Sequence, residues 1–273
     1  MKGMKVAYSG TEGAFAHIAA CKLYPAAEKI AYADFTKAYK AVESGECDVA
    51  VLPVENSYNG EVGQVTDLMF SGSLYVNGIY DLPITQDLLA KRGTRIEDIK
   101  EVVSHPQAFG QCSEYIQRHG FTRHEFANTA LAAKWVKERD VCSVAAIASR
   151  EAAEIFDLEV IDHDINASRS NSTRFAIFSR VASKLPTGGG VHSILLFTVR
   201  NEAGALAKAI DVIGRHGFNM RTLRSRPMKD LLWEYYFYVE VEGSIDSPEG
   251  ADLINCLGEF CDKLKFAGTY IKL

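Results

Sequence analysis

The sequence lacks the short motifs that identify several common enzyme chemistries. It contains no HExxH, GxSxG, GxGxxG or GxxxxGK segment. Zinc-assisted hydrolysis, serine hydrolysis and phosphoryl transfer from ATP therefore lack their usual signatures. The six cysteines include no CxxC pair and form no recognised zinc motif with histidine. We expect neither a metal nor a cofactor, which leaves binding of a small polar ligand or a cofactor-free reaction.

Long apolar runs and an excess of positive charge are also absent. No stretch approaches the roughly 18 apolar residues of a membrane span, and the first ten residues lack the apolar core of a signal peptide. Thirty Lys and Arg stand against 35 Asp and Glu, a net charge of −5, which argues against nucleic acid as the main ligand. A chain of this size buries a sufficient core without disulfides, so we expect reduced thiols and a cytoplasmic protein.

The first two thirds of the 273 residues alternate short apolar strands with amphipathic helices. This rhythm is typical of an α/β layer with a mostly parallel sheet. The predicted strands are 5–8, 30–33, 48–52, one ending at 102–103, 141–147 and 173–178. The predicted helices are 14–23, 36–44 capped by Thr36, 62–70, one from Pro106 to Gly120, one capped by Asn128 and Thr129 that ends near 139, and 149–156.

A glycine-rich segment at 184–190 (KLPTGGG) predicts a linker, because three consecutive glycines hold no fixed backbone cheaply. The pattern that follows has its own order of elements. We predict strands at 192–199, 218–226, 231–241 and 266–273, with helices at 205–216 and 248–264. The order βαββαβ is the ferredoxin-like arrangement.

Five polar clusters follow or precede predicted strands, where an α/β sheet usually binds ligands. They are the segments 9–13, 55–60, 104–107, 128–129 and 168–175. Amides and hydroxyls there could bind carboxylate oxygens, Glu55 could position a hydroxyl, and Arg174 could hold a carboxylate. Each cluster also has a purely structural interpretation: a tight turn, a solvated loop, a helix cap or a surface charge.

Taken together and in order, these clusters resemble one enzyme family. The segments GTEG at 10–13, LPVENS at 52–57, SHPQA at 104–108 with Gln111 and Cys112, and NSTRF at 171–175 are similar to those of prephenate dehydratase. The tail resembles the ACT regulatory domain of that family, with GALA at 204–207, RSRP at 224–227 and LWEY at 232–235. The resemblance covers nearly the whole chain.

The resemblance implies a two-lobed catalytic region with a periplasmic-binding-protein-like fold and an active site in the cleft between its lobes. On this basis we expect a catalytic domain at 1–183, with lobes at about 1–78 plus 162–183 and at 79–161. A linker at 184–190 and an ACT domain at 191–273 would follow. No chorismate mutase region precedes Met1, so we expect the monofunctional form.

The family converts prephenate to phenylpyruvate, water and CO2 without a cofactor. The resemblance assigns an essential role to Thr173, which we expect to donate a hydrogen bond or relay a proton, and we add Glu55 as a second catalytic residue. The residues expected to bind substrate are Asn56, Ser57, Ser104, Gln107, Thr129, Asn171, Arg174 and Phe175. Two alternatives remain open: an arogenate dehydratase, and a non-catalytic amino-acid-sensing module on the same scaffold.

The ACT resemblance implies control by an amino acid, with phenylalanine as the expected effector. The residues expected to bind it are Gly204, Ala205, Leu206, Asn219, Ser225, Arg226 and Pro227. Three positions depart from the family pattern: Thr11 stands where Pro is frequent, Ala207 replaces Val, and Arg224 replaces Glu. ACT domains usually bind their ligand between subunits, so we expect a homodimer or homotetramer, with no nucleic-acid or membrane partner.

Overall fold

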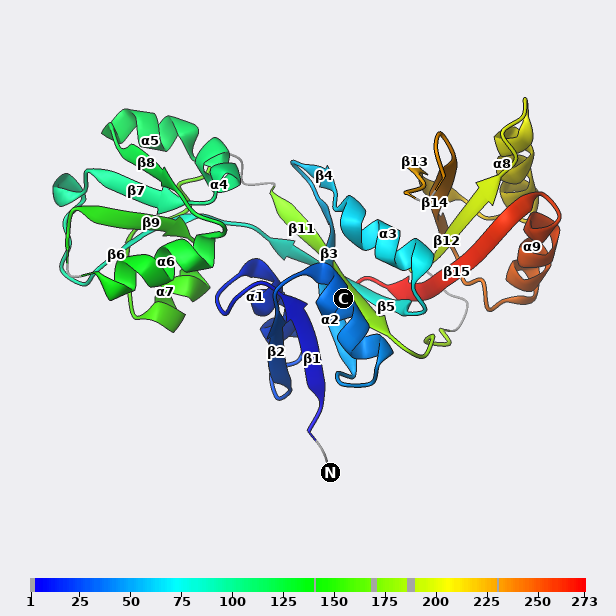
Figure 1. Ribbon diagram of the computed structural model, residues 1–273, viewed down its shortest axis with the longest axis horizontal. Helices are drawn as coiled ribbons and strands as arrows, with labels where there is room; N and C mark the ends of the chain where they lie inside the picture. The colour runs from blue at the N-terminus through cyan, green and yellow to red at the C-terminus, as the bar shows by residue number, and fades with distance from the viewer. Residues whose placement is uncertain (1–2, 140, 168–170, 186–189, 230) are drawn as a thin grey trace. The chain divides into compact units, whose positions relative to one another are not determined.

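The computed structural model describes residues 3–139, 141–167, 171–185, 190–229 and 231–273 (Figure 1). Residues 186–189 of the predicted linker and residues 168–170 of the predicted hydroxyl cluster lie outside these ranges. Within the described ranges, no helix combines the length and the apolar character needed to cross a lipid bilayer.

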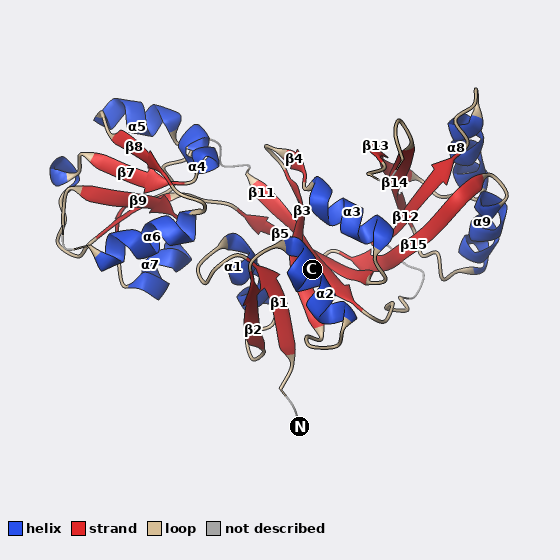
Figure 2. Cartoon of the chain, in the orientation of Figure 1, coloured by secondary structure: helices blue, strands red, loops and turns tan. Residues whose placement is uncertain are grey.

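Strands and helices alternate through the first part of the chain, as the pattern predicts (Figure 2). One sheet has the order β2-β1-β3-β11-β5, with β4 paired to β3. Its strands are β1 (Lys5–Ser9), β2 (Glu28–Tyr32), β3 (Val49–Asn56), β4 (Gly60–Glu61), β5 (Tyr75–Pro83) and β11 (Ser172–Ser179). The helices along this part are α1 (Phe15–Leu23), α2 (Phe35–Glu43) and α3 (Gly63–Ser71).

A second sheet has five strands in the order β10-β6-β9-β7-β8. They are β6 (Asp87–Ala90), β7 (Glu101–Ser104), β8 (Thr122–Glu125), β9 (Val144–Ala148) and β10 (Glu159–Asp162). The helices are α4 (Pro106–Gln111), α5 (Ser113–His119), α6 (Thr129–Glu138), α7 (Arg150–Phe156) and the short 3₁₀ helix η1 (Ile96–Asp98). Strand β7 is parallel to β8 and β9, whereas β6 is antiparallel to β9 and β10.

Both faces of this second sheet are covered at its centre, which explains why β6, β7 and β9 are mostly apolar, whereas the edge strand β8 is polar and exposed. Val102 packs in a core cluster with residues of α4 and α5, and its neighbour Val103 packs with residues of α6 and α7. Successive residues of a strand point to opposite faces, so one helix pair covers each face (Figure 1). All of β9 is buried for the same reason.

The C-terminal sheet has the order β13-β14-β12-β15. Its elements are β12 (Val191–Val199), α8 (Ala205–Arg215), β13 (Met220–Pro227), β14 (Tyr235–Glu242), α9 (Pro248–Gly258) and β15 (Cys261–Ile271). This is the predicted βαββαβ order. Helices α8 and α9 lie together on one face of the sheet (Figure 1), where Phe197, Ile213 and Leu253 belong to one buried core cluster.

The chain forms two compact units, each assembled from several segments. The first contains Met1–Ala38, Glu55–Gly60 and Leu82–Arg174, and includes the five-stranded sheet. The second contains Tyr39–Val54, Glu61–Asp81 and Phe175–Leu273, and includes the four-stranded sheet. The predicted domain and lobe boundaries stay predictions.

Three local predictions were wrong. The side chain of Asp34, not of Thr36, accepts a hydrogen bond from the first turn of α2, at the backbone N of Lys37. Residues 231–234 form the turn of the β13–β14 hairpin and not a strand, and Trp233 there has a φ of 64°. Helix α9 ends at Gly258, because the chain from Cys261 onward hydrogen-bonds along β12 instead of continuing the helix.

Candidate functional site

A pocket of about 250 Å³ lies within the first unit. Its lining residues are Ala14, Phe15, Asn56, Ile84, Gln86, His105, Gln107, Ala108, Gln111, Ala127, Asn128, Thr129 and Thr173. Amide, hydroxyl and imidazole groups are the polar groups of this lining, and none of the lining residues in the described ranges is Lys, Arg, Asp or Glu. An anion in this pocket would therefore be held by neutral donors.

Asn56 is the hydrogen-bonding centre of the pocket wall. Its Oδ1 accepts hydrogen bonds from the backbone N of Tyr58 (3.0 Å) and of Asn59 (2.9 Å). Backbone N–H groups can only donate, so these bonds fix the orientation of the amide. The Nδ2 then donates to Asn171 Oδ1 (2.9 Å), to the backbone O of Ser172 (3.2 Å) and to Thr173 Oγ1 (3.0 Å).

These bonds determine what the hydroxyl of Thr173 can do. Since Oγ1 accepts from Asn56, the proton of the hydroxyl is left to donate elsewhere. Thr173 also lines the pocket. The hydroxyl can therefore donate a hydrogen bond to a molecule in the pocket.

The N-termini of two helices contribute residues to the pocket lining. Its lining includes Ala14 and Phe15 at the start of α1, and Asn128 and Thr129 at the start of α6. The N-cap of α1 is Ala14, which makes no side-chain capping bond, whereas Asn128 Oδ1 accepts from the backbone N of Leu131 at 2.7 Å. The partial positive charge of a helix N-terminus stabilises anions.

A third helix, α4, begins at the same pocket. His105 is its N-cap, and the ring Nδ1 accepts from the backbone N of Gln107 at 3.2 Å. Pro106 occupies the first helical position, as the sequence predicts. Both His105 and Gln107 line the pocket.

Two buried glutamines complete the polar lining, and the sequence reasoning missed one of them. The Nε2 of Gln86 donates to Gln111 Oε1 at 3.3 Å. The Oε1 of Gln86 is buried and has no hydrogen-bond partner in the described part of the chain. Gln111 belongs to a quoted motif, but Gln86 gave only the weak signal of a polar residue before an apolar strand.

Several predicted site residues make structural contacts instead of lining the pocket. Ser104 is fully buried, and its Oγ donates to the backbone O of Ile147 at 2.6 Å, which joins β7 to β9. Ser57 exchanges two 2.9 Å hydrogen bonds with Ser172, one from its backbone N and one to its Oγ. Both contacts hold the polypeptide segments that carry the lining residues.

The remaining predicted residues also lie outside the lining. Arg174 Nη1 and Glu55 Oε2 form an ion pair at 3.5 Å. Phe175 is 1 % exposed and part of the core. Asn171 is buried, receives the bond from Asn56, and leaves its own Nδ2 without a partner in the described ranges.

Comparisons with known proteins match this chain along nearly its full length. The profile of the prephenate dehydratase family matches residues 6–183, and that of the ACT domain matches residues 193–255. This chain belongs to the prephenate dehydratase family. It is an enzyme of the lyase class that acts in phenylalanine biosynthesis, and the predicted family, enzyme class and α/β fold with an ACT domain are confirmed.

Relatives carry names with two related substrates. An Arabidopsis thaliana arogenate dehydratase/prephenate dehydratase is 33 % identical, over 98 % of this chain and 72 % of its own length. A bifunctional chorismate mutase/prephenate dehydratase of Neisseria gonorrhoeae is 34 % identical, over 98 % of this chain and 74 % of its own length.

Solved structures agree on the fold. The prephenate dehydratase of Arthrobacter aurescens, in complex with L-Phe, is 27 % identical with a TM-score of 0.90, covering 98 % of this chain and 90 % of that one. GqqA, described as a novel type of quorum-quenching acylase, is 30 % identical with a TM-score of 0.90 and 98 % coverage of both chains.

The ACT domain of this chain carries the predicted effector residues at two separate places. Strands β12 and β13 are both antiparallel to β14, so they run in the same direction. The C-terminal ends of both strands therefore lie at the same end of the sheet. Gly204, the N-cap of α8, follows β12 at that end of the sheet, and the segment 225–227 ends β13 at the same end. Asn219 follows α8 at the other end, about 16 Å away by helix length, and its Nδ2 donates to Glu242 Oε2 at 2.8 Å.

Arg226 joins β13 to α3 of the catalytic region within the second unit. Its Nε donates to Asp67 Oδ1 at 3.0 Å and to Tyr236 Oη at 3.1 Å. The Tyr236 hydroxyl in turn donates to Asp67 Oδ1 at 2.6 Å, and its ring stacks on Phe70 with centroids 4.2 Å apart. Burial favours a higher pKa for Asp67, but hydrogen bonds from Arg226, Tyr236 and Lys229 hold that pKa below its ordinary value.

Proposed function

We propose that the pocket around Thr173 is where this enzyme converts prephenate to phenylpyruvate, water and CO2. The observation that supports this most directly is the hydrogen bond from Asn56 to Thr173 Oγ1. It leaves the hydroxyl proton to be donated into a pocket whose other polar groups suit an anion. The substrate is a dianion that loses a hydroxyl, so it needs both an anion-binding wall and a donor to the leaving oxygen.

The reaction balances with a single proton. The bond between the ring and its carboxylate breaks, and its electron pair enters the ring as the carboxylate leaves as CO2. The C–O bond of the ring hydroxyl breaks at the opposite position, and one proton converts the departing hydroxide to water. In our proposal the Thr173 hydroxyl hydrogen-bonds to this oxygen as charge develops on it and relays to it one proton, which solvent supplies.

The lining favours prephenate over arogenate. The two molecules differ at the side chain, where prephenate has a keto group and arogenate an ammonium. An ammonium is best matched by a carboxylate, and no Asp or Glu is among the lining residues in the described ranges. The amide of Gln107 can donate a hydrogen bond to a neutral carbonyl. We therefore expect a higher kcat/KM with prephenate when both substrates are assayed side by side.

Substitution of Thr173 tests the proposal. Thr173→Ala removes the donor and is expected to lower kcat by about 10²–10⁴-fold, the usual range for a positioned proton donor. Thr173→Ser keeps a hydroxyl and is expected to retain much more activity. Thr122→Ala, at an exposed position on β8, is the matched control.

Circular dichroism of each variant separates loss of chemistry from loss of folding. Undiminished turnover by folded Thr173→Ala removes Thr173 from the mechanism. Binding of prephenate by calorimetry without any turnover by the wild type would instead favour a non-catalytic sensing module.

We further propose that phenylalanine regulates the enzyme through the ACT domain, in a cytoplasmic homodimer or homotetramer. Gly204 and Asn219 lie at opposite ends of α8, so a ligand that contacts both would have to be bound by two copies of the domain. The edge strand β13, the hairpin turn after it and the start of β14 expose several apolar side chains: Leu223, Leu231, Leu232, Trp233 and Tyr235. Such an edge invites pairing with another chain. In the described part of the chain the six cysteines form no disulfide, which suits a reducing compartment.

Sedimentation analysis tests the assembly. Trp233 is 80 % exposed, and Trp233→Ser is expected to shift the protein toward smaller species while its secondary structure, measured by circular dichroism, stays unchanged. An unchanged sedimentation coefficient places the interface elsewhere.

A further inference from the structure

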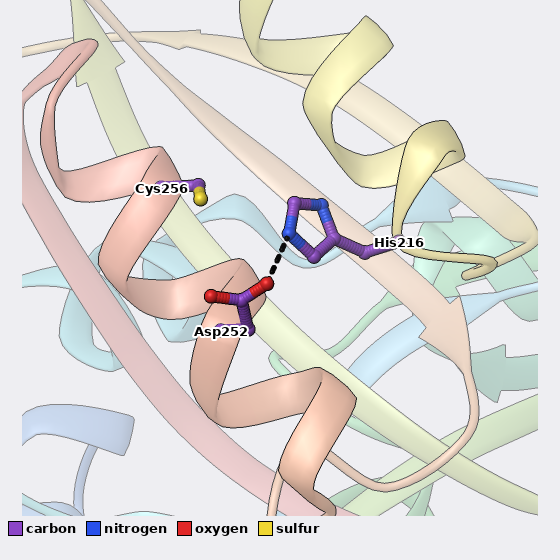
Figure 3. A group of neighbouring side chains, drawn as sticks. All are labelled: His216, Asp252 and Cys256. Atoms are coloured by element: carbon purple, nitrogen blue, oxygen red, sulfur yellow. Dashed lines mark hydrogen bonds and ion pairs between the residues drawn. The ribbon is translucent and has the colours of Figure 1, made fainter.

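Three potential metal ligands meet on the helical face of the ACT domain, outside the pocket and outside the predicted effector residues. They are His216, which follows α8, and Asp252 and Cys256 on α9 (Figure 3). Asp252 and Cys256 are four residues apart, so they share one face of α9. The imidazole, carboxylate and thiol ligand atoms all lie within 4.8 Å of one another.

The imidazole of His216 is already oriented as a metal ligand. Its Nδ1 lies 2.7 Å from the backbone O of Val212. A carbonyl oxygen can only accept, so Nδ1 carries a proton and Nε2 is the atom directed at Asp252, 3.2 Å from its Oδ2 (Figure 3). Metal-binding histidines in proteins are characteristically fixed in this way, with the second ring nitrogen donating to a carbonyl or carboxylate.

We propose that His216, Asp252 and Cys256 bind one zinc-like divalent cation that joins α8 to α9, with water as the fourth ligand. Imidazole, thiolate and carboxylate together suit Zn²⁺, which is borderline soft and prefers tetrahedral sites. Tetrahedral Zn²⁺ with bonds of about 2.0–2.3 Å places its ligands roughly 3.4–3.6 Å apart. The ligand atoms now lie within 4.8 Å of one another. Neither Asp252 nor Cys256 is buried, so modest rotations of their side chains bring the ligand atoms to the spacing that Zn²⁺ requires.

The charges around Cys256 favour a thiolate that is bound to a cation over a thiolate that stands alone. The carboxylates of Asp252 and Glu259 lie near the Cys256 thiol and oppose a negative charge on its sulfur. The same carboxylates attract a divalent cation, which stabilises the thiolate that they otherwise oppose. Binding therefore releases the thiol proton, together with any proton shared between His216 and Asp252, into solvent.

A second His–Cys pair provides an internal comparison. His17 Nε2 lies 3.4 Å from Cys21 Sγ on α1, a spacing similar to that of a ligand pair. Its Nδ1, however, accepts a hydrogen bond from the backbone N of Gly13 at 3.2 Å. The proton therefore sits on Nε2, the atom that faces the cysteine, so this pair is not arranged for a metal.

The proposal is tested by titration with Co²⁺ and Zn²⁺ of the full chain from which a chelator has first removed any metal. Co²⁺ is expected to bind with one equivalent and to give a thiolate-to-cobalt charge-transfer band, which Zn²⁺ then displaces. Cys256→Ser should abolish the band and weaken Zn²⁺ binding at least tenfold, as measured by competition with a chromophoric chelator. Cys21→Ser, the matched control, should leave both unchanged.

Thermal unfolding gives a second measurement. Zn²⁺ should raise the Tm of the wild type and of Cys21→Ser, but not of Cys256→Ser, because only a folded site binds the metal. A charge-transfer band that survives in Cys256→Ser, or no stoichiometric Co²⁺ binding by the folded wild type, would show that His216 and Asp252 form only a hydrogen-bonded link between the helices.

Discussion

Asn56 and Thr173 are 117 positions apart in the sequence, yet the amide of one donates a 3.0 Å hydrogen bond to the hydroxyl of the other. The amide is held by two backbone N–H groups of its own loop, so its orientation does not depend on the ligand. One asparagine thus arranges both the polar loop after β3 and the start of β11. Because the Thr173 oxygen accepts from Asn56, its hydroxyl proton points away from that amide.

Replacing Asn56 by aspartate should reverse that direction. Asn56→Asp preserves shape but replaces the donating Nδ2 with an acceptor, so the Thr173 hydroxyl would donate to the new carboxylate and not to the substrate. The added negative charge also repels a dianion. We expect kcat to fall by about 10²–10³-fold. Steady-state kinetics with prephenate check this, with exposed Asn201→Asp as control. Wild-type kcat in Asn56→Asp would contradict the assigned hydrogen-bond direction.

Gln86 should determine how tightly the substrate binds. Its buried Oε1 lacks a partner in the described ranges and belongs to the pocket lining, so it is placed to accept a hydrogen bond from the substrate or a bound water. Gln86→Leu removes this acceptor and the bond to Gln111. We expect kcat/KM to fall by roughly 5–150-fold, the effect of about 1–3 kcal/mol, mainly through KM.

Exposed Gln117→Leu is the control for this substitution, because it makes the same chemical change away from the pocket. If Gln86→Leu leaves KM unchanged while it lowers stability, Gln86 serves only to support the packing of the pocket wall.

The sequence predicted the elements of this fold well where the local pattern and the packing agree. Pro106 and Gly120 begin and end the α4–α5 segment, as local chemistry requires, and Asn128 caps α6. One error was local, because Asp34 and not Thr36 caps α2, and another lies where long-range pairing decides the structure. Residues after Gly258 have a helical pattern, but the strand pairing of β15 with β12 prevails.

The sequence located several residues of the candidate site, but it could not show which of the predicted residues line the pocket and which support its walls. The motifs located Asn56, Gln107, Thr129 and Thr173, all of which line the pocket. They could not show that Ser104 bonds to the backbone of β9, because a buried hydroxyl and a ligand-binding hydroxyl look alike in a sequence. Gln86 has no motif of its own, and only the folded chain brings it to Gln111.

The buried hydroxyl of Tyr236 should stabilise the contact between the ACT strands and α3. It donates to Asp67 at 2.6 Å and accepts from Arg226. Tyr236→Phe removes this group while it keeps the stacked ring, and we expect the free energy of unfolding to fall by about 1–2 kcal/mol. Urea denaturation measures the change. The adjacent Tyr235→Phe, at an exposed position, should alter stability by less than about 0.5 kcal/mol. Equal effects of the two variants would show that the hydrogen bond adds nothing.

Acid should weaken the same contact through Asp67. Its pKa is lowered in the folded chain, so the stability it contributes is fully present above its unfolded pKa of about 4 and is lost as the pH falls through the lower folded value. Asp67→Asn lacks this titration.

We expect the wild type to be more stable than Asp67→Asn by about 1.5–3 kcal/mol at neutral pH, with the difference in stability narrowing below about pH 4. Urea midpoints across this range measure it, with exposed Asp262→Asn as control. A difference that stays constant down to the acid transition would mean that the carboxylate of Asp67 gains nothing from its charge, and that Arg226 and Tyr236 are held by packing alone.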